Sequence, residues 1–551
     1  MKRISIRTLA IVYLILISSG FGFAGKARKS FIADVVIYGS TSPAIMSAVQ
    51  LARMKKHVII VCPEMHIGGM SSSGLSFTDV GNKNVVGGLS REFYQRIYSH
   101  YQNSKSWNWQ RKDEFGNVGQ GTKAMDSEIK AMWVFEPHVA EKVFEDYIKE
   151  NKIKIVRNKW LDRKDGVEMK DGKIVSITML TGEHFKGKIF IDATYEGDLM
   201  AAAGVSYTVG RESNSMYNEK WNGNQPNIFH HGHNFGTLNI SPYRIPNNAA
   251  SGLLPRISSA TPGKKGEGDH RIQAYCFRTC LTDVKENRVP FKRPENYDST
   301  QYELLARLVE KGWSTPLGAG NLPNRKKDAN NKGAFSHDNI GMNYDYPEAS
   351  YEERKRILKE HETYQKGLFY FYATDTRVPV KVREIFNTWG LSKNEFVDNG
   401  NWPYQIYVRE ARRMIGESVI TENEVQGEAP VLQPIGMGAY AIDSHNTHRY
   451  VTPEGFVQNE GDIGVGVKKP YQISLGVILP KRQQCSNLIV SAALSSSHSA
   501  FGSVRMEPVF MILGQSAGTL AGMALDRKMG LHEVPYSDLR KRLQDDKQIL
   551  E

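Results

Sequence analysis

Two side chains near the C-terminus have the chemistry of a reaction centre. His498 and Arg505 lie in the segment SSSHSAFGSVRMEP, directly after the apolar run of residues 487–494. An imidazole that titrates near neutral pH suits a general base, and a guanidinium can hold an anionic substrate or a negative charge that develops during a reaction. A structural hydrogen bond or ion pair is the competing interpretation for each side chain. Both residues are therefore candidate catalytic groups in an expected loop after the last strand, and Glu507 of the same segment is a further polar candidate.

A short turn near the N-terminus has the spacing of a phosphate-binding site. Its sequence is GSTSPA, from Gly39 to Ala44. Dinucleotide sites need a glycine for the tight turn, a second where backbone meets the pyrophosphate, and a third small residue where helix packs on strand. Here Gly39 and Ala44 meet the first and third requirements, and Thr41 takes the second position. We expect Gly39, Ser40, Thr41 and Ala44 to line the turn, although an ordinary strand-turn-helix would fit this pattern alone.

Two further features lie just beyond the second predicted strand. The dinucleotide pattern expects an acidic residue at the end of that strand, but Cys62 stands there and Glu64 follows two residues later. We therefore expect Glu64, or a backbone group, to contact the ribose. Gly68 and Gly69, followed by Met70, would let the backbone approach a large planar ligand, with a flexible glycine loop as the alternative.

The elements that must position these residues are strands and helices of an α/β sheet. Four compact apolar runs are typical of buried parallel strands: residues 33–39, 57–61, 188–194 and 487–494. Residues 44–53 have helical spacing, so a strand-helix-strand unit begins the predicted domain. Thr194 stands at the end of the third run, where sheets of this kind bind ligands.

The rest of the chain divides into a meander and an insertion. Residues 153–156 and the segments from 162 to 187 are short alternating strands joined by Asp-Gly and Thr-Gly turns, which predicts a β-meander. Residues 210–436 are rich in Asn, Pro, Tyr and Gly and contain the predicted helix EERKRILKEHETYQKGLFYFYA. We expect this region to be an inserted domain.

Four segments, in this order, resemble the large FAD-dependent oxidoreductase family related to the glutathione-reductase-type flavoproteins, in a secreted bacterial branch. They are GSTSPA, HIGGMSSSGL, DATYEGDL and SAALSSSHSAFGSVRMEPVFMILGQSAG. The resemblance covers both ends of the chain and nearly all of the predicted flavin domain. Any one segment would be a weak signal, and the four together are a strong one. The departures are Cys62, where relatives commonly have Glu, and Pro43-Ala44, where Ala-Gly is common.

The resemblance implies non-covalent FAD as the cofactor and a particular fold. That fold is α/β, with a Rossmann-type FAD-binding domain assembled from both chain ends, a β-meander and an inserted mixed α+β substrate domain. The expected divisions are residues 1–24, 25–209, 210–436 and 437–551, for a signal peptide, the first part of the flavin domain, the insertion and the C-terminal return. The residues of the first turn, Gly68 to Met70 and Thr194 would line the cofactor, and a helix terminus at Gly514 and Gly518 would close the site.

The expected function is an exported FAD-dependent oxidoreductase. Hydride would pass to flavin from a small polar substrate, carbohydrate-derived molecules included, and an electron acceptor that the sequence does not identify would reoxidise it. Two alternatives remain open at this stage. One is a lyase or hydrolase-like enzyme with no net redox turnover, and the other is a flavin-binding scaffold without catalysis.

The first 24 residues have the order of a secretory signal. A basic start, MKRISIR, leads into an apolar stretch and then small residues ending at Ala24. That stretch is shorter than the ~20 residues that span a bilayer, and we expect no later segment to be long and apolar enough for a span. We therefore expect a periplasmic or secreted protein without stable membrane insertion after cleavage.

Charge and composition limit the partners. The net charge of +12 includes three basic residues of the signal segment, and the remaining charge is spread without a dense basic run. Nucleic acid is therefore not an expected partner. A small-molecule substrate and an electron acceptor are expected, and the oligomeric state is undetermined.

Three other groups of residues favour structural roles. Cys276 and Cys280 could form a disulfide, but two buried residues on one helix face are the favoured interpretation. They lack a partner pair of zinc ligands, and residues 328–333 lack the closing Glu of a calcium loop, so no metal is expected. The segment YVREARRMIGES predicts a helix that carries Arg409, Arg412 and Arg413, for which a solvated face is favoured.

Overall fold

Strands from both ends of the chain form one parallel sheet. The computed structural model describes residues 29–313 and 317–551, so the predicted signal segment lies outside the described residues. The strand order is β24-β10-β2-β3-β6. These strands are β2 (Val35–Tyr38), β3 (Val58–Val61), β6 (Lys154–Val156), β10 (Ile189–Asp192) and β24 (Leu488–Val490). All four apolar runs predicted as parallel strands are confirmed.

Both faces of this sheet are buried, each against a different layer. Val35 and Ile37 of β2 share an apolar cluster with helix α1 (Ser42–Arg53). Val36 and Tyr38 of the same strand belong to a second cluster, which contains residues of an antiparallel sheet. Successive side chains of a strand point to opposite faces, so a strand covered on both faces needs a continuous apolar run.

The antiparallel layer is the predicted meander. Strands β7 (Val167–Lys170), β8 (Lys173–Thr178) and β9 (His184–Lys186) pair in succession, and β1 (Ser30–Ile32) adds in parallel to β9. The meander is confirmed for these three strands but wrong for residues 153–156. That segment contains β6, which pairs with β3 at the edge of the parallel sheet. Its side chains Ile153 and Ile155 pack with the helical layer, which explains the placement.

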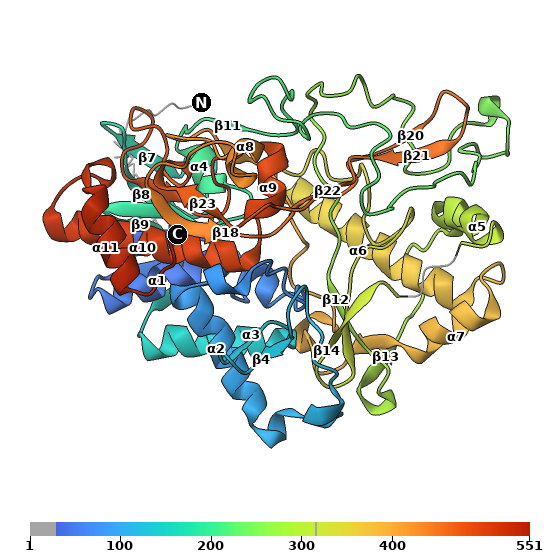
Figure 1. The fold of residues 1–551 in the computed structure, drawn as a ribbon, viewed down its shortest axis with the longest axis horizontal. Helices are drawn as coiled ribbons and strands as arrows, with labels where there is room; N and C mark the ends of the chain where they lie inside the picture. Colours follow the sequence, from blue (N-terminus) through green and yellow to red (C-terminus); the bar gives the residue numbers. More distant parts are fainter. Residues whose placement is uncertain (1–28, 314–316) are drawn as a thin grey trace, which may run out of the picture.

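Helix α10 (Glu507–Arg527) packs along α1 on the other face of the parallel sheet (Figure 1). A Cβ added at Gly514 would lie 2.4 Å from the carbonyl oxygen of Pro43, and one at Gly518 would lie 2.6 Å from that of Ser47. The two glycines therefore let the helices approach closely. They stand inside α10, so the expectation that they form a helix terminus is wrong.

The same helix corrects the expectation about membrane spans. By length and composition alone α10 could cross a bilayer, but 94% of its most apolar window is buried inside the protein. Such burial is what a core helix of a folded domain shows. Other helices of this half of the molecule are α2 (Gly88–Gln102), α3 (Pro137–Glu150), α4 (Asp198–Ala202) and α11 (Tyr536–Asp545).

The middle of the chain forms a mixed α+β region with its own antiparallel sheet, of order β13-β16-β12-β15-β14. Its strands are β12 (Thr279–Thr282), β13 (Arg288–Pro290), β14 (Ala319–Leu322), β15 (Lys326–Ala329) and β16 (Gly390–Ser392). Helices α5 (Glu303–Glu310), α6 (Tyr351–Thr374) and α7 (Val380–Thr388) accompany it (Figure 1). The predicted long helix is confirmed as α6, whose N-cap Ser350 accepts a hydrogen bond from the Glu353 amide.

The segment after residue 436 does not return at once to the parallel sheet. Strands β18 (Pro434–Gly438) and β23 (Tyr471–Ser474) pair with each other, as do β19 (Ile442–Ser444) and β22 (Ile463–Val465). The hairpin of β20 (His448–Val451) and β21 (Val457–Glu460) packs with the middle region, where Arg449 donates to the carbonyl of Ala334 at 2.9 Å. The division at residue 436 stays a prediction.

Two expectations about the middle region are wrong. Arg409, Arg412 and Arg413 lie on no helix and are buried. Each pairs with a different carboxylate: Arg409 with Asp338, Arg412 with Asp198, and Arg413 with Glu212. Cys276 and Cys280 are buried and free, but Cys280 belongs to strand β12 rather than to a helix.

Candidate cofactor and substrate site

The turn between β2 and α1 accepts only a residue without a side chain at its first position. Gly39 has φ +108°, and a Cβ there would lie 2.9 Å from the carbonyl carbon and oxygen of Ala193. The turn therefore lies directly against the end of strand β10. This close approach brings the N-terminus of α1 to the carboxyl edge of the sheet, where α/β proteins bind phosphates.

The N-terminus of α1 has no side-chain cap. Thr41 occupies the N-cap position, but its hydroxyl donates to the carbonyl of Ala193 at 2.5 Å instead of accepting a bond from the helix. The first turn contains no acidic residue, and Ala44 is buried within it. A helix end of this kind presents backbone N–H groups and positive dipole charge to an anion. This geometry fits the pyrophosphate of a dinucleotide.

A buried carboxylate ties α10 to this turn. Glu507 accepts hydrogen bonds from the hydroxyls of Ser42 at 2.6 Å, Ser71 at 2.8 Å and Tyr195 at 2.5 Å. Burial raises the pKa of Glu507. Because Ser42 and Ser71 donate to Glu507, the backbone N–H groups of α1 are the donors left for a phosphate. Of these four side chains the sequence points only to Glu507, as a polar catalytic candidate, and the structure gives it a bonding role at the turn instead.

The glycine pair lies beside the first turn, as its predicted role requires. The Gly68 amide donates to the carbonyl of Ser40 at 2.7 Å. A Cβ at Gly69 would lie 2.4 Å from the hydroxyl of Tyr195 and 3.2 Å from Cα of Thr41. The Met70 amide donates to the Tyr195 hydroxyl at 3.0 Å. Both glycines have positive φ, so the backbone path there depends on them.

Glu64 is the carboxylate nearest to this turn on the side of β3. Its Oε2 accepts a hydrogen bond from the Ser40 hydroxyl at 2.8 Å. Cys62 is buried, and its thiol lies 3.5 Å from the carbonyl oxygen of Glu64, so it offers no acceptor to a ribose. Burial and the nearby Glu196 carboxylate raise the pKa of Glu64 to about 7.

This pKa predicts that FAD affinity depends on pH. An ionised Glu64 carboxylate accepts hydrogen bonds from ribose hydroxyls better than the neutral acid does. With a pKa of about 7, the ionised fraction rises about tenfold from pH 6 to pH 8. We expect the dissociation constant for FAD, measured by flavin fluorescence on protein stripped of cofactor, to fall about tenfold over this range. Glu64→Gln should abolish the pH dependence, and an unchanged dependence in this variant would exclude Glu64 from the ribose contact.

Thr194 supports the site from the end of β10. Its hydroxyl donates to Asp192 at 2.7 Å and accepts from the Gly197 amide at 3.0 Å. A Cβ at Gly39 would come within 3.0 Å of its methyl group. Thr194 therefore fixes the turn on which Gly39 rests, and its hydroxyl is already bonded within the protein.

A polar cavity of about 390 Å³ lies between the segment that follows the glycine pair and the inserted region. Phe77 and Asp79 line it from the first side, and residues 317–320 and 330–332 line it from the second. Its ionisable side chains are Asp79, Arg278, Lys332, Tyr407, Tyr440, Asp443 and His445. A concave polar space between a cofactor domain and an insertion is a usual place for a small substrate.

His445 is the imidazole that lines this cavity. Its Nδ1 lies 2.7 Å from a carboxylate oxygen of Asp338, which is itself paired with Arg409 at 2.9 Å. Burial opposes the charge on Asp338, but Arg409 and His445 hold its pKa well below the usual range. A carboxylate can only accept, so Nδ1 of His445 carries a hydrogen, and in the neutral ring Nε2 is the acceptor. Nε2 lies 3.7 Å from Asp443.

The two predicted catalytic residues differ in their relation to the cavity. Arg505, the C-cap of helix α9 (His498–Val504), contacts two of its lining residues, with a 2.5 Å bond to the Tyr407 hydroxyl and a 2.9 Å bond to the carbonyl of Asp443. His498 begins α9 rather than lying in a loop, and it does not line the cavity. Its ring contacts Glu410 at 2.8 Å and Ser444 at 3.3 Å.

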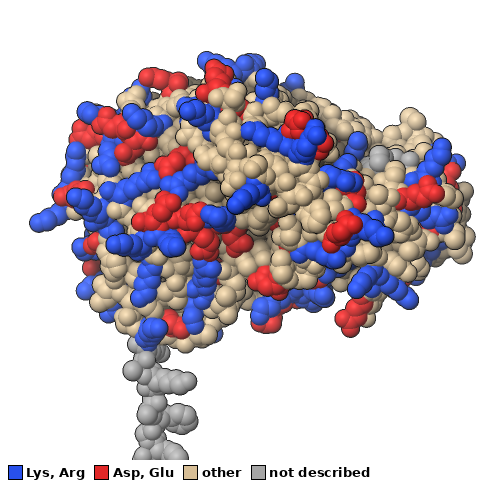
Figure 2. Space-filling view, turned by 90° about the horizontal axis from the view of Figure 1, so that it is seen from below, with Lys and Arg blue, Asp and Glu red and all other residues tan. Residues whose placement is uncertain are grey.

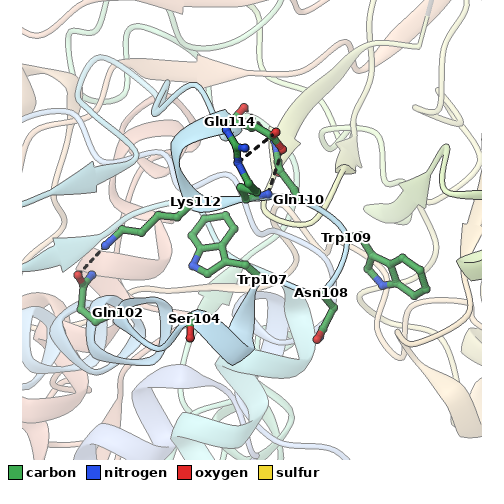
Figure 3. A pocket seen from close by; sticks show the side chains of 9 residues that line it. Gln102, Ser104, Trp107, Asn108, Trp109, Gln110, Lys112 and Glu114 are labelled. Carbon is green, nitrogen blue, oxygen red and sulfur yellow. Dashed lines mark hydrogen bonds and ion pairs between the residues drawn. The ribbon is translucent and has the colours of Figure 1, made fainter.

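A second hollow, of about 510 Å³, is formed by residues 102–114 alone (Figure 3). Figure 3 shows Trp107 among its polar lining side chains, which bond to one another, as Lys112 does to Gln102 at 2.7 Å. No predicted site residue lines either hollow, but Arg505 bonds to two of the residues that line the cavity at His445. The cavity at His445 is therefore the better candidate for the substrate.

The chain belongs to the family of FAD-dependent oxidoreductases, which it matches over residues 34–543. With the parallel sheet and its glycine turn, this membership makes the protein a Rossmann-type flavoprotein. It is an FAD-dependent oxidoreductase, and FAD is its cofactor. The comparison with curated proteins found no match.

Similar solved structures include three enzymes by their names. L-Proline dehydrogenase from P. horikoshii is 18% identical, with 34% of this chain and 58% of that chain covered and a TM-score of 0.23. L-Amino acid deaminase from Proteus vulgaris is 18% identical, covering 32% and 51%, with a TM-score of 0.23. OxyS anhydrotetracycline hydroxylase from Streptomyces rimosus is 14% identical, covering 33% and 36%, with a TM-score of 0.24. The matches thus span about a third to three fifths of those chains.

Proposed function

We propose that this oxidoreductase oxidises a small polyhydroxylated molecule, carbohydrate-derived compounds included, in the cavity at His445. The observation that carries the proposal is a hydrogen-bonded His445–Asp338 pair on the wall of a polar cavity. The cavity borders both the segment after the glycine pair and the predicted substrate domain. Its ionisable and amide side chains suit a ligand with several hydroxyl groups better than an apolar one.

The roles of the protein side chains follow from their bonds. When FAD is bound, it supplies the hydride acceptor. Oxidation of a substrate CH–OH group to a carbonyl also releases the hydroxyl proton, and Nε2 of His445 is the acceptor for it. Asp338 and Arg409 fix the ring through Nδ1, so Nε2, 3.7 Å from Asp443, is the nitrogen available to the substrate. Arg505 positions Tyr407 and Asp443 and brings positive charge to the cavity wall.

Localisation and partners complete the proposal. The order of residues 1–24 supports export to the periplasm or the medium. Figure 2 shows basic and acidic side chains intermixed over the face that it presents, which supports a small-molecule substrate rather than nucleic acid. The electron acceptor is a separate partner, since oxidation of substrate leaves two electrons on the cofactor.

Anaerobic reduction tests this function. Protein purified with FAD should lose its yellow colour when a member of a panel of sugars, uronic acids and hydroxy acids is added without oxygen. Bleaching requires net transfer of two electrons, so it separates the proposed oxidation from a lyase or hydrolase reaction. Conversion of a panel compound without any bleaching would favour catalysis without net redox change. No bleaching and no conversion across the panel would contradict the substrate class.

A further inference from the structure

A histidine-rich loop lies against a buried aspartate at the edge of the substrate cavity. Residues 230–233 have the sequence His-His-Gly-His. Side-chain ligand atoms of His231, His233 and Asp462 all lie within 4.8 Å of one another. The expectation of no metal site drew on the cysteines and on residues 328–333, and it passed over this loop. Two imidazoles and one carboxylate are ligands that zinc and related divalent ions prefer.

Asp462 organises the loop through backbone contacts. One of its oxygens, Oδ2, accepts the amides of His231 at 3.2 Å and His233 at 3.1 Å. The other oxygen, Oδ1, lies 2.6 Å from Nδ1 of His231. The loop therefore keeps its path over Asp462 whatever the imidazole rings bind. Oδ1 is therefore the oxygen that can bind a metal ion, in place of the proton that it shares with Nδ1 of His231.

The charge balance distinguishes this cluster from a similar one. Asp462 is 1% exposed, and within residues 29–313 and 317–551 no lysine or arginine forms an ion pair with it. Glu136, His138 and Glu395 form the second group of possible ligands. There the ammonium of Lys326 lies 2.7 Å from Glu136 and 2.5 Å from Glu395, so the protein supplies the cation itself. The cluster at Asp462 has no such internal cation.

We propose that His231, His233 and Asp462 bind a divalent transition-metal ion of the zinc type. The site adjoins the cavity through two lining residues. Asp443 lies 3.8 Å from Nε2 of His231, and Asn331 lies 3.1 Å from Nδ1 of His233. Three protein ligands leave a coordination position open, as in catalytic zinc sites. A substrate oxygen or a water in the cavity is the ligand that fits there.

Binding requires a measurable rearrangement. Zinc bonds to nitrogen and oxygen are about 2.0–2.2 Å long, which places two tetrahedral ligands about 3.4 Å apart. Nδ1 of His231 and Oδ1 of Asp462 therefore have to separate, and the proton between them is released.

Calorimetric titration of the FAD-loaded protein, without an affinity tag and without substrate, tests the site. Zn²⁺ should bind with a 1:1 stoichiometry, and the heat in buffers of different ionisation enthalpy should report proton release. His233→Ala should weaken binding by about tenfold or more. This variant keeps the fold, because the side chain of His233 has one hydrogen-bond partner, Asn331, whereas its backbone carbonyl retains Asn446 and Asn459.

The control variant is His138→Ala, which alters the cluster that contains Lys326 and should leave zinc binding unchanged. Co²⁺ absorption spectra of the wild type should show tetrahedral or five-coordinate bands that His233→Ala removes. The proposal is overturned if the wild type shows no saturable 1:1 binding, or if His233→Ala binds zinc as tightly as the wild type does. Both readouts are independent of oxidoreductase activity, so they stand or fall apart from the proposed function.

Discussion

Gly39→Val protein is expected to purify without colour and to remain colourless after incubation with FAD. The added Cβ would lie 2.9 Å from backbone atoms of Ala193, and the φ of +108° is unfavourable for a β-branched residue. Relief of the clash requires the N-terminus of α1 to move away from the end of β10, and this movement displaces the N–H groups that face the pyrophosphate. The flavin absorbance per mole of protein measures the result.

Gly182→Val is the matched control for this variant. Gly182 also has a positive φ, of +88°, but a Cβ there meets no atom within 4 Å. The backbone strain is thus similar, without the clash. We expect Gly182→Val to retain stoichiometric FAD. A yellow Gly39→Val protein with the wild-type flavin content would refute the assignment of this turn to the pyrophosphate.

His445→Ala is expected to retain FAD but to undergo reduction by substrate about 10²–10⁴ times more slowly, the usual cost of losing a proton-transfer group. His445 is the imidazole on the cavity wall, and its bond to Asp338 places a hydrogen on Nδ1, so Nε2 is the acceptor of the neutral ring. Asp338→Asn should also slow the reaction, because an amide can donate to Nδ1 and favour the wrong tautomer. Stopped-flow bleaching of the flavin under anaerobic conditions measures both rates.

His498 and Arg505 decide between the two possible reaction centres. Arg505→Ala should slow reduction, since Arg505 orients Tyr407 and Asp443 at the cavity. His498→Ala should leave the rate near that of the wild type and lower stability by about 1.5–3 kcal/mol, because the buried Glu410 carboxylate loses its bond to the ring. If His498→Ala is as slow as we expect of His445→Ala, and His445→Ala is normal, then the base is His498, as its place in the sequence predicts.

The sequence predicts those parts of the site that depend on short stretches of chain. A strand buried on both faces needs an uninterrupted apolar run, and a turn at positive φ needs glycine, so β2, β10 and Gly39 can be located from local patterns. The glycine pair Gly68-Gly69 can be located in the same way, because both residues have positive φ. Local patterns therefore located the residues of the first turn and of the glycine loop that the structure brings together.

Contacts between distant segments are not encoded in this local way. The arginines at 409, 412 and 413 have helical spacing, but carboxylates from other parts of the chain bind each of them in the interior. The glycine spacing at Gly514 suggests a helix end, whereas a glycine is needed there because α1 packs closely against α10. No local motif marks His445, because its role depends on Asp338, more than a hundred residues earlier.

The hydrogen bond between Ser42 and Glu507 has a consequence for the time at which the cofactor can be acquired. It joins the first helix of the described chain to one of the last, and β24 borders β10 from the same late segment. While the ribosome is still making residues 488–527, strand β10 has an unpaired edge and the pyrophosphate turn lacks the helix that packs beside it. We therefore expect FAD to bind only after α10 has been made, and a chain that ends before α10 to retain none.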